Sequence, residues 1–344
     1  MSRSEQWQTV LRITVIVLPF SVLFGCVLGY FLGESDGTSV VAGGFIGGLL
    51  ALGTVTFDVS WGVGLVSRRW REAPFLVILV TRSLVWLAII VVGISVPLLL
   101  VAEVPTDELA TAEMGWTVAA TFAVAIAINF TLLIARLLGP GVLPSLLLGR
   151  YHRPREEVRI FLLVDLRESS GIAERLGNLR YHAFLKRFIA DVSANAVRFG
   201  AEIHRYVGDE VILTWRAAEG LRNAACLRFA WAMQKHLDEA APEYFAAFGV
   251  APQTWAGMHM GPVVTGEVGT LKHEIVYLGD TLNTAARIEQ ACRTFQRPFL
   301  VSSAVVEKLD LPAEANAENL GPVELRGIGT PLELYAVGQD KAAP

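Results

Sequence analysis

EIHRYVGDEVILTW, the stretch from Glu202 to Trp215, contains two apolar runs that meet at the dipeptide Gly208-Asp209. Valine, isoleucine, tyrosine and tryptophan favour β-strands, and glycine beside aspartate between two such runs is typical of a tight turn. The stretch therefore predicts a β-hairpin, with strands over Glu202–Val207 and Glu210–Trp215.

The segments on both sides of this hairpin alternate between strand and helix patterns. Arg159–Val164 is an apolar β run, and apolar residues at helical spacing follow it from Ile172 to Val192. Downstream we expect a helix around Cys226–Leu237, strands over Thr254–Met260, Val263–Val268 and Glu274–Leu278 with a Gly261-Pro262 turn between the first two, and a helix over about Thr281–Ala291. The order β-α-β-β-α-β predicts an α+β domain with a ferredoxin-like core and helices on one face of the sheet.

The first half of the chain has a different composition. Over all 344 residues the hydrophobic content is 53%, and the mean hydropathy of +0.47 is above that of a soluble protein. Before Arg150 the charged residues form short clusters between long apolar runs, whereas after it they are interleaved. This change in composition at Arg150 predicts a membrane domain over 1–138, a linker over 139–157 and a globular domain over 158–340.

Four apolar stretches are long enough for transmembrane helices, since crossing ~30 Å of hydrocarbon takes about 20 residues. They run over Leu11–Leu32, Val40–Trp61, Phe75–Val101 and Trp116–Leu138. The first is too long, and too poorly followed by a cleavage site, for a signal peptide. The sequence therefore predicts a four-span, multi-pass protein.

Arginine placement predicts the orientation of the spans. Arginines precede the first span, lie between the second and third, and follow the fourth, at Arg3, Arg12, Arg68, Arg69, Arg71, Arg136 and Arg150. The other two connections carry acidic residues without lysine or arginine. Both termini are thus expected on the cytoplasmic side of the inner or plasma membrane. Proline and glycine in the linker predict a hinge there, and its basic run Arg150–Arg153 is expected to meet anionic lipid headgroups.

Some features of the first half allow two interpretations. Gly43 and Gly47 form a small-residue face that suits either packing inside the bundle or a dimer contact. Arg82 and Asp58 are ionisable residues in or near the spans, which indicates either a functional site or side chains that snorkel to the membrane surface.

Overall composition excludes other classes. A net charge of −4 argues against nucleic acid as a partner, and three cysteines without a CxxC pair argue against structural zinc or a disulfide framework.

Acidic residues at expected strand ends carry the chemistry of the second half. Asp165 ends the first strand of that half, and Asp209 occupies the hairpin turn. Two neighbouring carboxylates can hold hard cations together with substrate phosphates. The segment Leu166–Gly171 leads into a helix whose free N–H groups can receive a triphosphate. Taken one at a time, these residues are also common in turns and helix caps.

Together these residues resemble a known family. Four ordered segments are similar to the signatures of class III adenylate and guanylate cyclases: Phe161–Gly171, His204–Val211, Gly257–Gly266 and Leu278–Glu289. The resemblance covers about Arg159–Val337, which makes 158–340 the expected cyclase domain of a chain with an N-terminal multi-span membrane domain.

The resemblance implies a site and a reaction. Asp165 and Asp209 would bind two Mg²⁺ or Mn²⁺ ions, with the backbone carbonyl of Leu166 as a further ligand, while Asn283 orients the ribose and Arg287 stabilises charge on the α-phosphate. The triphosphate would lie against Glu168, Ser169, Ser170 and Gly171. Each site would take its metals from one subunit and its Asn and Arg from the other, so a head-to-tail homodimer is expected. ATP would be converted to 3′,5′-cyclic AMP by in-line attack of the ribose 3′ oxygen on the α-phosphorus, with pyrophosphate as the leaving group.

Two departures bear on the substrate. Arg205 stands where adenylate cyclases carry a base-reading Lys, and Val276 stands where they carry Asp or Thr. Valine cannot accept a hydrogen bond from the adenine amino group. ATP is therefore expected from the family resemblance alone, and GTP ranks second because the Glu and Cys of guanylate cyclases are missing too. Arg326 can be a triphosphate contact or a surface arginine.

Two other functions compete with this prediction. A diguanylate cyclase is disfavoured because Val207 replaces the first glycine of that family's turn and nothing there corresponds to the segment with Asn283 and Arg287. A catalytically silent membrane receptor that binds nucleotide is disfavoured by the presence of all four residues expected to hold metals, ribose and phosphate.

Overall fold

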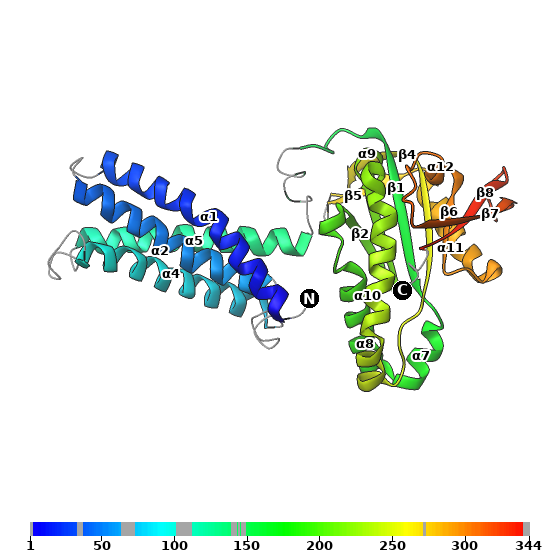
Figure 1. Cartoon of the computed structure of the whole chain (residues 1–344), viewed down its shortest axis with the longest axis horizontal. Helices are drawn as coiled ribbons and strands as arrows, with labels where there is room; N and C mark the ends of the chain where they lie inside the picture. Colours follow the sequence, from blue (N-terminus) through cyan, green and yellow to red (C-terminus); the bar gives the residue numbers. More distant parts are fainter. Residues whose placement is uncertain are drawn as a thin grey trace. The chain divides into compact units, whose positions relative to one another are not determined.

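The computed structural model describes residues 3–32, 37–62, 73–100, 112–138, 143, 145, 149–270 and 273–339. Arg68, Arg69, Arg71, most of the two acidic connections and most of 139–148 lie outside the described residues, so the expectations for them stay predictions. The chain divides into two compact units, Met1–Leu137 and Leu138–Pro344. Figure 1 shows a helical first unit and a second unit that contains the sheet.

In the described part of the first unit, four helices run alongside one another (Figure 1). They are α1 (Arg3–Leu32), α2 (Gly37–Gly62), α4 (Phe75–Leu100) and α5 (Ala112–Leu138). Three contain a segment long and apolar enough to cross a membrane: Ile13–Phe31, Gly37–Ser60 and Phe75–Pro97. In α5 the corresponding segment, Phe122–Ala135, is shorter. The described residues thus contain three candidate spans, and the fourth stays a prediction.

The glycines of α2 face α1 of the same chain. A Cβ atom added at Gly43 would lie 2.3 Å from the carbonyl oxygen of Gly25, and one at Gly47 would lie 2.2 Å from that of Ser21. No side chain fits there, so only glycine allows the two backbones to approach this closely. Of the two interpretations of this face, the structure favours packing inside the bundle.

Arg82 joins three helices of the first unit. Its side chain is fully buried and donates hydrogen bonds to Asp58 Oδ1 on α2 (2.6 Å) and Asn129 Oδ1 on α5 (3.1 Å). The expectation that Arg82 snorkels is therefore wrong. A buried guanidinium stays charged, and Asp58 and Asn129 provide a carboxylate and an amide acceptor for it within the bundle.

The second unit is built on an eight-stranded sheet. Its strands are β1 (Arg155–Leu166), β2 (Glu202–Val207), β3 (Glu210–Arg216), β4 (Thr254–Val268), β5 (Glu274–Leu278), β6 (Phe299–Ser302), β7 (Ala315–Val323) and β8 (Leu332–Gln339). They are ordered β2-β3-β1-β4-β6-β8-β7, and β5 also pairs with β4. The predicted hairpin Glu202–Trp215 is confirmed as β2 and β3. β1 begins inside the segment predicted as a linker.

Helices cover both faces of this sheet, so the prediction that they lie on one face only is wrong. The main ones are α7 (Ser169–Leu176), α8 (Asn178–Ser193), α10 (Ala225–Phe248) and α11 (Asp280–Phe295), and the short ones are α9 (Ala217–Leu221), α12 (Ser303–Val306) and two 3₁₀ turns at Val197–Phe199 and Arg222–Ala224. Ile160 and Leu162 of β1 point to the main core with α8 and α10, whereas Phe161 and Leu163 pack against Ala285 of α11. Since strand residues alternate between faces, Asp165 lies on the α11 face.

Two local predictions differ from the structure. The pattern Ile172–Val192 forms two helices, because Gly177 between them has a φ of +70° that interrupts the helical path. The predicted Gly261-Pro262 turn is wrong, because β4 continues through it and pairs with β1. A Cβ atom at Gly261 would lie 2.6 Å from Thr281 Oγ1, so this glycine admits α11 rather than turning the chain.

Candidate active site

The structure brings Asp165 and Asp209 together at one end of the sheet. Strands β1 and β3 pair with Val164 opposite Val211, so Asp165 follows the paired part of β1 and Asp209 occupies the turn before β3. Gly208 has a φ of +64°, which glycine adopts without strain and which this turn requires. Burial raises the pKa of the Asp165 carboxyl, and the neighbouring Asp209 raises it further. The two carboxylates thus form a pair that favours a bound cation or proton.

Two glutamates that sequence reasoning missed extend this pair. Burial, and next the charge of Asp165, raise the pKa of Glu210 and of Glu289 to about 7 each. In both, the Oε1 atom is buried and accepts no hydrogen bond from any residue that the structure describes. We refer to Asp165, Asp209, Glu210 and Glu289 as the carboxylate cluster.

Arg293 of α11 is the cation that faces this cluster. Its Nη2 lies 2.6 Å from Asp165 Oδ2 and 3.9 Å from Glu289 Oε1, and 59% of its side chain is exposed. A sequence signal exists for both α11 residues: Glu289 falls on the apolar stripe of Ala285 and Cys292, and Arg293 follows one turn later. This signal indicates a role near Asp165 only when the packing of α11 against the sheet is known, and the sequence does not predict that packing.

The cluster fits a divalent metal that also binds a phosphate. No group of three or more His, Cys, Asp or Glu side chains is arranged to hold a metal among the residues that the structure describes. However, Mg²⁺ in nucleotide enzymes usually takes one or two carboxylates and completes its shell with water and phosphate oxygens. The Asp165–Asp209 pair and the Leu166 carbonyl can supply such a partial set, and the carboxyl groups of Glu210 and Glu289 favour positive charge beside it.

A pocket of about 490 Å³ adjoins the cluster. It is lined by residues 166–170, Trp255, Arg293 and Gln296, and it therefore includes Glu168, Ser169 and Ser170, while Gly171 follows within α7. The Arg167 guanidinium lies 3.9 Å from the centre of the Trp255 ring. A helix start flanked by two arginines is suited to anionic groups.

Asn283 and Arg287 are not part of this cluster within one chain. Asn283 is exposed, and half-buried Arg287 donates to Gln290 Oε1 at 2.8 Å. In the described part of the chain no hydrogen bond or ion pair joins either residue to the cluster. Their side of α11 is thus available to another molecule.

The two residues expected near the base lie on β2 and β5, whereas Arg326 lies elsewhere in the sequence between β7 and β8. Arg205 of β2 donates to Glu274 Oε2 of β5 at 2.6 Å, and Val276 is half-buried on β5. Arg326 is exposed, and no hydrogen bond or ion pair in the described ranges connects it to the carboxylate cluster.

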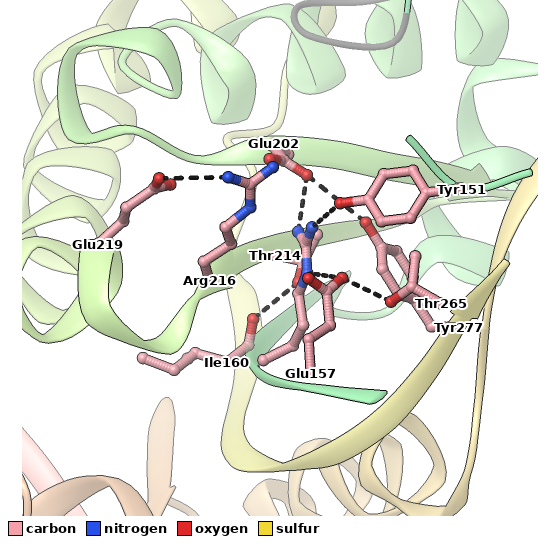
Figure 2. Close-up of polar contacts among 10 residues, drawn as sticks. Tyr151, Glu157, Ile160, Glu202, Thr214, Arg216, Glu219, Thr265 and Tyr277 are labelled. Carbon is pink, nitrogen blue, oxygen red and sulfur yellow. Dashed lines mark hydrogen bonds and ion pairs between the residues drawn. The ribbon is translucent and has the colours of Figure 1, made fainter. Parts of the chain in front are cut away.

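A buried arginine braces the opposite end of β1. Arg159 is fully buried and donates to Glu157 Oε1 (2.9 Å), Glu202 Oε2 (2.7 Å) and the Tyr151 hydroxyl (3.1 Å). Figure 2 shows these groups converging from the segment before β1, from β1 and from β2, with Tyr277 of β5 beside them. The guanidinium lies 4.9 Å from the centre of the Tyr277 ring. This network, which we call the Arg159 brace, holds four segments of the unit together.

The comparisons with known proteins agree with this architecture. A solved structure described as a bacterial light-regulated adenylyl cyclase matches 68% of this chain and 68% of its own, with a TM-score of 0.56 and 19% identity. The fold is therefore that of a nucleotide cyclase. Residues 151–339 match the family model described as adenylate and guanylate cyclase catalytic domain, and this chain belongs to that family.

Curated relatives include adenylate cyclases. Adenylate cyclase 2 of Rhizobium meliloti (strain 1021) is 38% identical over 210 residues, which cover 61% of this chain and 58% of that protein. Adenylate cyclase 1 of the same organism is 30% identical over 189 residues, covering 53% of this chain and 28% of that protein. The chain thus spans little more than half the length of the first relative and less of the second.

Proposed function

We propose that this chain is a membrane-bound adenylate cyclase that converts ATP to 3′,5′-cyclic AMP and pyrophosphate. The observation that carries the proposal is the pairing of Asp165 with Asp209 beside the pocket at the start of α7. Membership of the cyclase family and the 38% identity to an adenylate cyclase support it. The strand order β4-β1-β3-β2 supports a ferredoxin-like core, with 158–340 as the cyclase domain.

Each residue has a role in this proposal. Asp165, Asp209 and the Leu166 carbonyl bind two Mg²⁺ or Mn²⁺ ions, and residues 168–171 hold the triphosphate through N–H and hydroxyl groups. Bound divalent ions supply charge compensation at the phosphates and assist loss of the 3′ proton. Arg293, now paired with Asp165, is released when cations and substrate fill the site.

The active site is shared between two copies of the chain. Among the residues that the structure describes, no hydrogen bond or ion pair links Asn283 or Arg287 to the carboxylate cluster of the same chain, which supports a head-to-tail homodimer in which they serve the partner's cluster. Asn283 orients the ribose and Arg287 stabilises the charge that develops on the α-phosphate.

The first unit anchors the enzyme in the inner or plasma membrane. Three apolar helices support this location, and we retain α5 as the fourth span with both termini cytoplasmic. The cyclase unit then lies where ATP is available.

Product analysis tests the function. Purified full-length protein with Mn²⁺ is incubated with ATP or with GTP, and the products are separated by chromatography. Cyclic AMP from ATP is expected, and Asp165→Asn or Asp209→Asn abolishes it. Asp238→Asn, a change at an exposed aspartate of α10 whose partner is Gln234, is the matched control. Cyclic GTP alone would favour the guanylate cyclase alternative, and no cyclic product from either would favour the silent receptor.

Complementation tests the shared site. Asp209→Ala and Arg287→Ala chains, each inactive, are expected to recover activity when mixed, because one of the two sites in the heterodimer has every residue intact. Asp209→Ala mixed with Asp165→Ala stays inactive, since both changes affect the same half of the site. Equal activity in the two mixtures, with heterodimers verified, would contradict the shared site.

A further inference from the structure

Strand β5 lies over the face of β1 and β2, although its backbone pairs with β4. The Tyr277 ring is 5.3 Å from the ring of Phe161 on β1 and 4.8 Å from that of His204 on β2, measured between ring centres. The Arg159 guanidinium also contacts the Tyr277 ring, so the Arg159 brace holds this strand in place. The hairpin formed by β4 and β5 is thus fixed relative to β2.

This arrangement sets Glu274 opposite Arg205. The two charged groups are 2.6 Å apart, and their side chains remain 36% and 48% exposed. Glu274 and Val276 lie on the same face of β5, because strand residues two apart share a face. Next to Arg205, burial lowers the pKa of His204 to about 4, so this histidine is uncharged near neutral pH. Arg205 and Glu274 therefore present a hydrogen-bond donor and an acceptor side by side, and both side chains are partly exposed to solvent.

Adenine requires this combination. The N1 atom of its Watson–Crick edge accepts a hydrogen bond, and its 6-amino group donates one. A guanidinium only donates, and a carboxylate only accepts. Val276 offers an apolar wall and no acceptor, so without Glu274 the 6-amino group would lose its hydrogen bond on entering the site, which is costly.

We propose that Glu274 and Arg205 read the purine base together, with Glu274 accepting from the 6-amino group of adenine and Arg205 donating to N1. Glu274 is then a specificity-determining residue, and the acceptor absent at Val276 is supplied two positions earlier on the same strand face. The inference rests on the proposed function with ATP as substrate.

Purine riboside triphosphate, which is ATP without the 6-amino group, isolates this contact. For the unmodified full-length protein kcat/KM is expected to be about 10- to 100-fold higher with ATP, the value of one hydrogen bond to a charged group. In Glu274→Ala the ratio of kcat/KM for ATP to kcat/KM for purine riboside triphosphate is expected to fall to about 1, since no acceptor for the 6-amino group remains. Glu274→Gln keeps an acceptor oxygen and is expected to retain part of the ratio.

The control is Glu267→Ala on the same hairpin. Glu267 is likewise paired with a basic side chain, His273, at 2.6 Å, and this change should leave the ratio as it is. If Glu274→Ala abolishes turnover, the ratio of affinities for the two nucleotides in 3′-deoxy form, measured by displacement of a fluorescent ATP analogue, replaces the kinetic ratio.

Two results separate the inference from the proposed function. An unchanged ratio in Glu274→Ala, with cyclic AMP still formed by the unmodified protein, overturns the role of Glu274 and leaves the cyclase intact. A preference of the unmodified protein for GTP, or the absence of any cyclic product, contradicts the proposed function itself.

Discussion

Replacement of Arg159 by methionine tests the brace between the segment before β1 and the three strands around it. Methionine fills most of the volume of the arginine stem, so the loss is mainly that of three hydrogen bonds and a charge. Removing one partner from a buried ion pair costs about 3–5 kcal/mol. Glu157 and Glu202 keep 21% and 35% of their side chains exposed and regain some hydration, so we expect the low end, about 3 kcal/mol.

Hydrogen exchange of the full-length protein, followed by mass spectrometry of β1 and β3 peptides, measures this loss within the second unit. A loss of about 3 kcal/mol speeds exchange through unfolding roughly 100-fold. Arg297→Met is the matched control, because that arginine pairs with Glu318 at the surface, where an ion pair contributes about 0–1 kcal/mol. The double change Arg159→Met with Glu202→Gln should recover part of the loss, since it removes an unpaired charge. Equal exchange rates in Arg159→Met and Arg297→Met would refute the reasoning.

Two further predictions concern the carboxylate cluster. Arg293→Gln removes the cation beside Asp165 and is expected to tighten Mn²⁺ binding without nucleotide about 3- to 10-fold, measured by electron paramagnetic resonance, while Arg297→Gln changes nothing. Weaker binding in Arg293→Gln would show that the ion pair does not compete with metal. Folding raises the pKa of Glu289 from 4.5 to about 7, so its favourable contribution is complete below 4.5 and is lost as the pH rises through 7. Glu289→Gln should therefore stabilise the metal-free second unit by about 1–2 kcal/mol near pH 8 but not near pH 4. Urea unfolding followed by proteolysis measures this difference. An equal gain in stability at both pH values would show that the raised pKa of Glu289 is not its cause.

Features that depend on local chemistry were predictable from the sequence. The β2–β3 hairpin matches its predicted limits to within one residue, because Gly208 and the flanking β-branched residues are local signals for a turn and two strands. Its antiparallel pairing with β1 then brings Asp165 near Asp209, which a strand-end argument also predicts.

Features that depend on tertiary contacts were not. Gly261 and Pro262 have the composition of a turn, yet Thr281 of α11 needs the space that the glycine leaves. Glu289 belongs to the carboxylate cluster, and Arg293 faces it, only because α11 lies against β4, where a Cβ atom at Gly257 would meet the Glu289 backbone nitrogen at 2.2 Å. Glu274 contacts Arg205 only because β5 lies over β2. No spacing in the sequence predicts this arrangement of the two strands.

The glycine contact between α1 and α2 also limits what the first unit can bind. Where backbone atoms of Gly25 and Gly43 touch, neither an acyl chain nor a sterol fits between the two helices. A lipophilic effector of this protein would therefore have to enter through a different helix pair, and a photoreactive lipid should label α1 and α2 only on their outer surfaces.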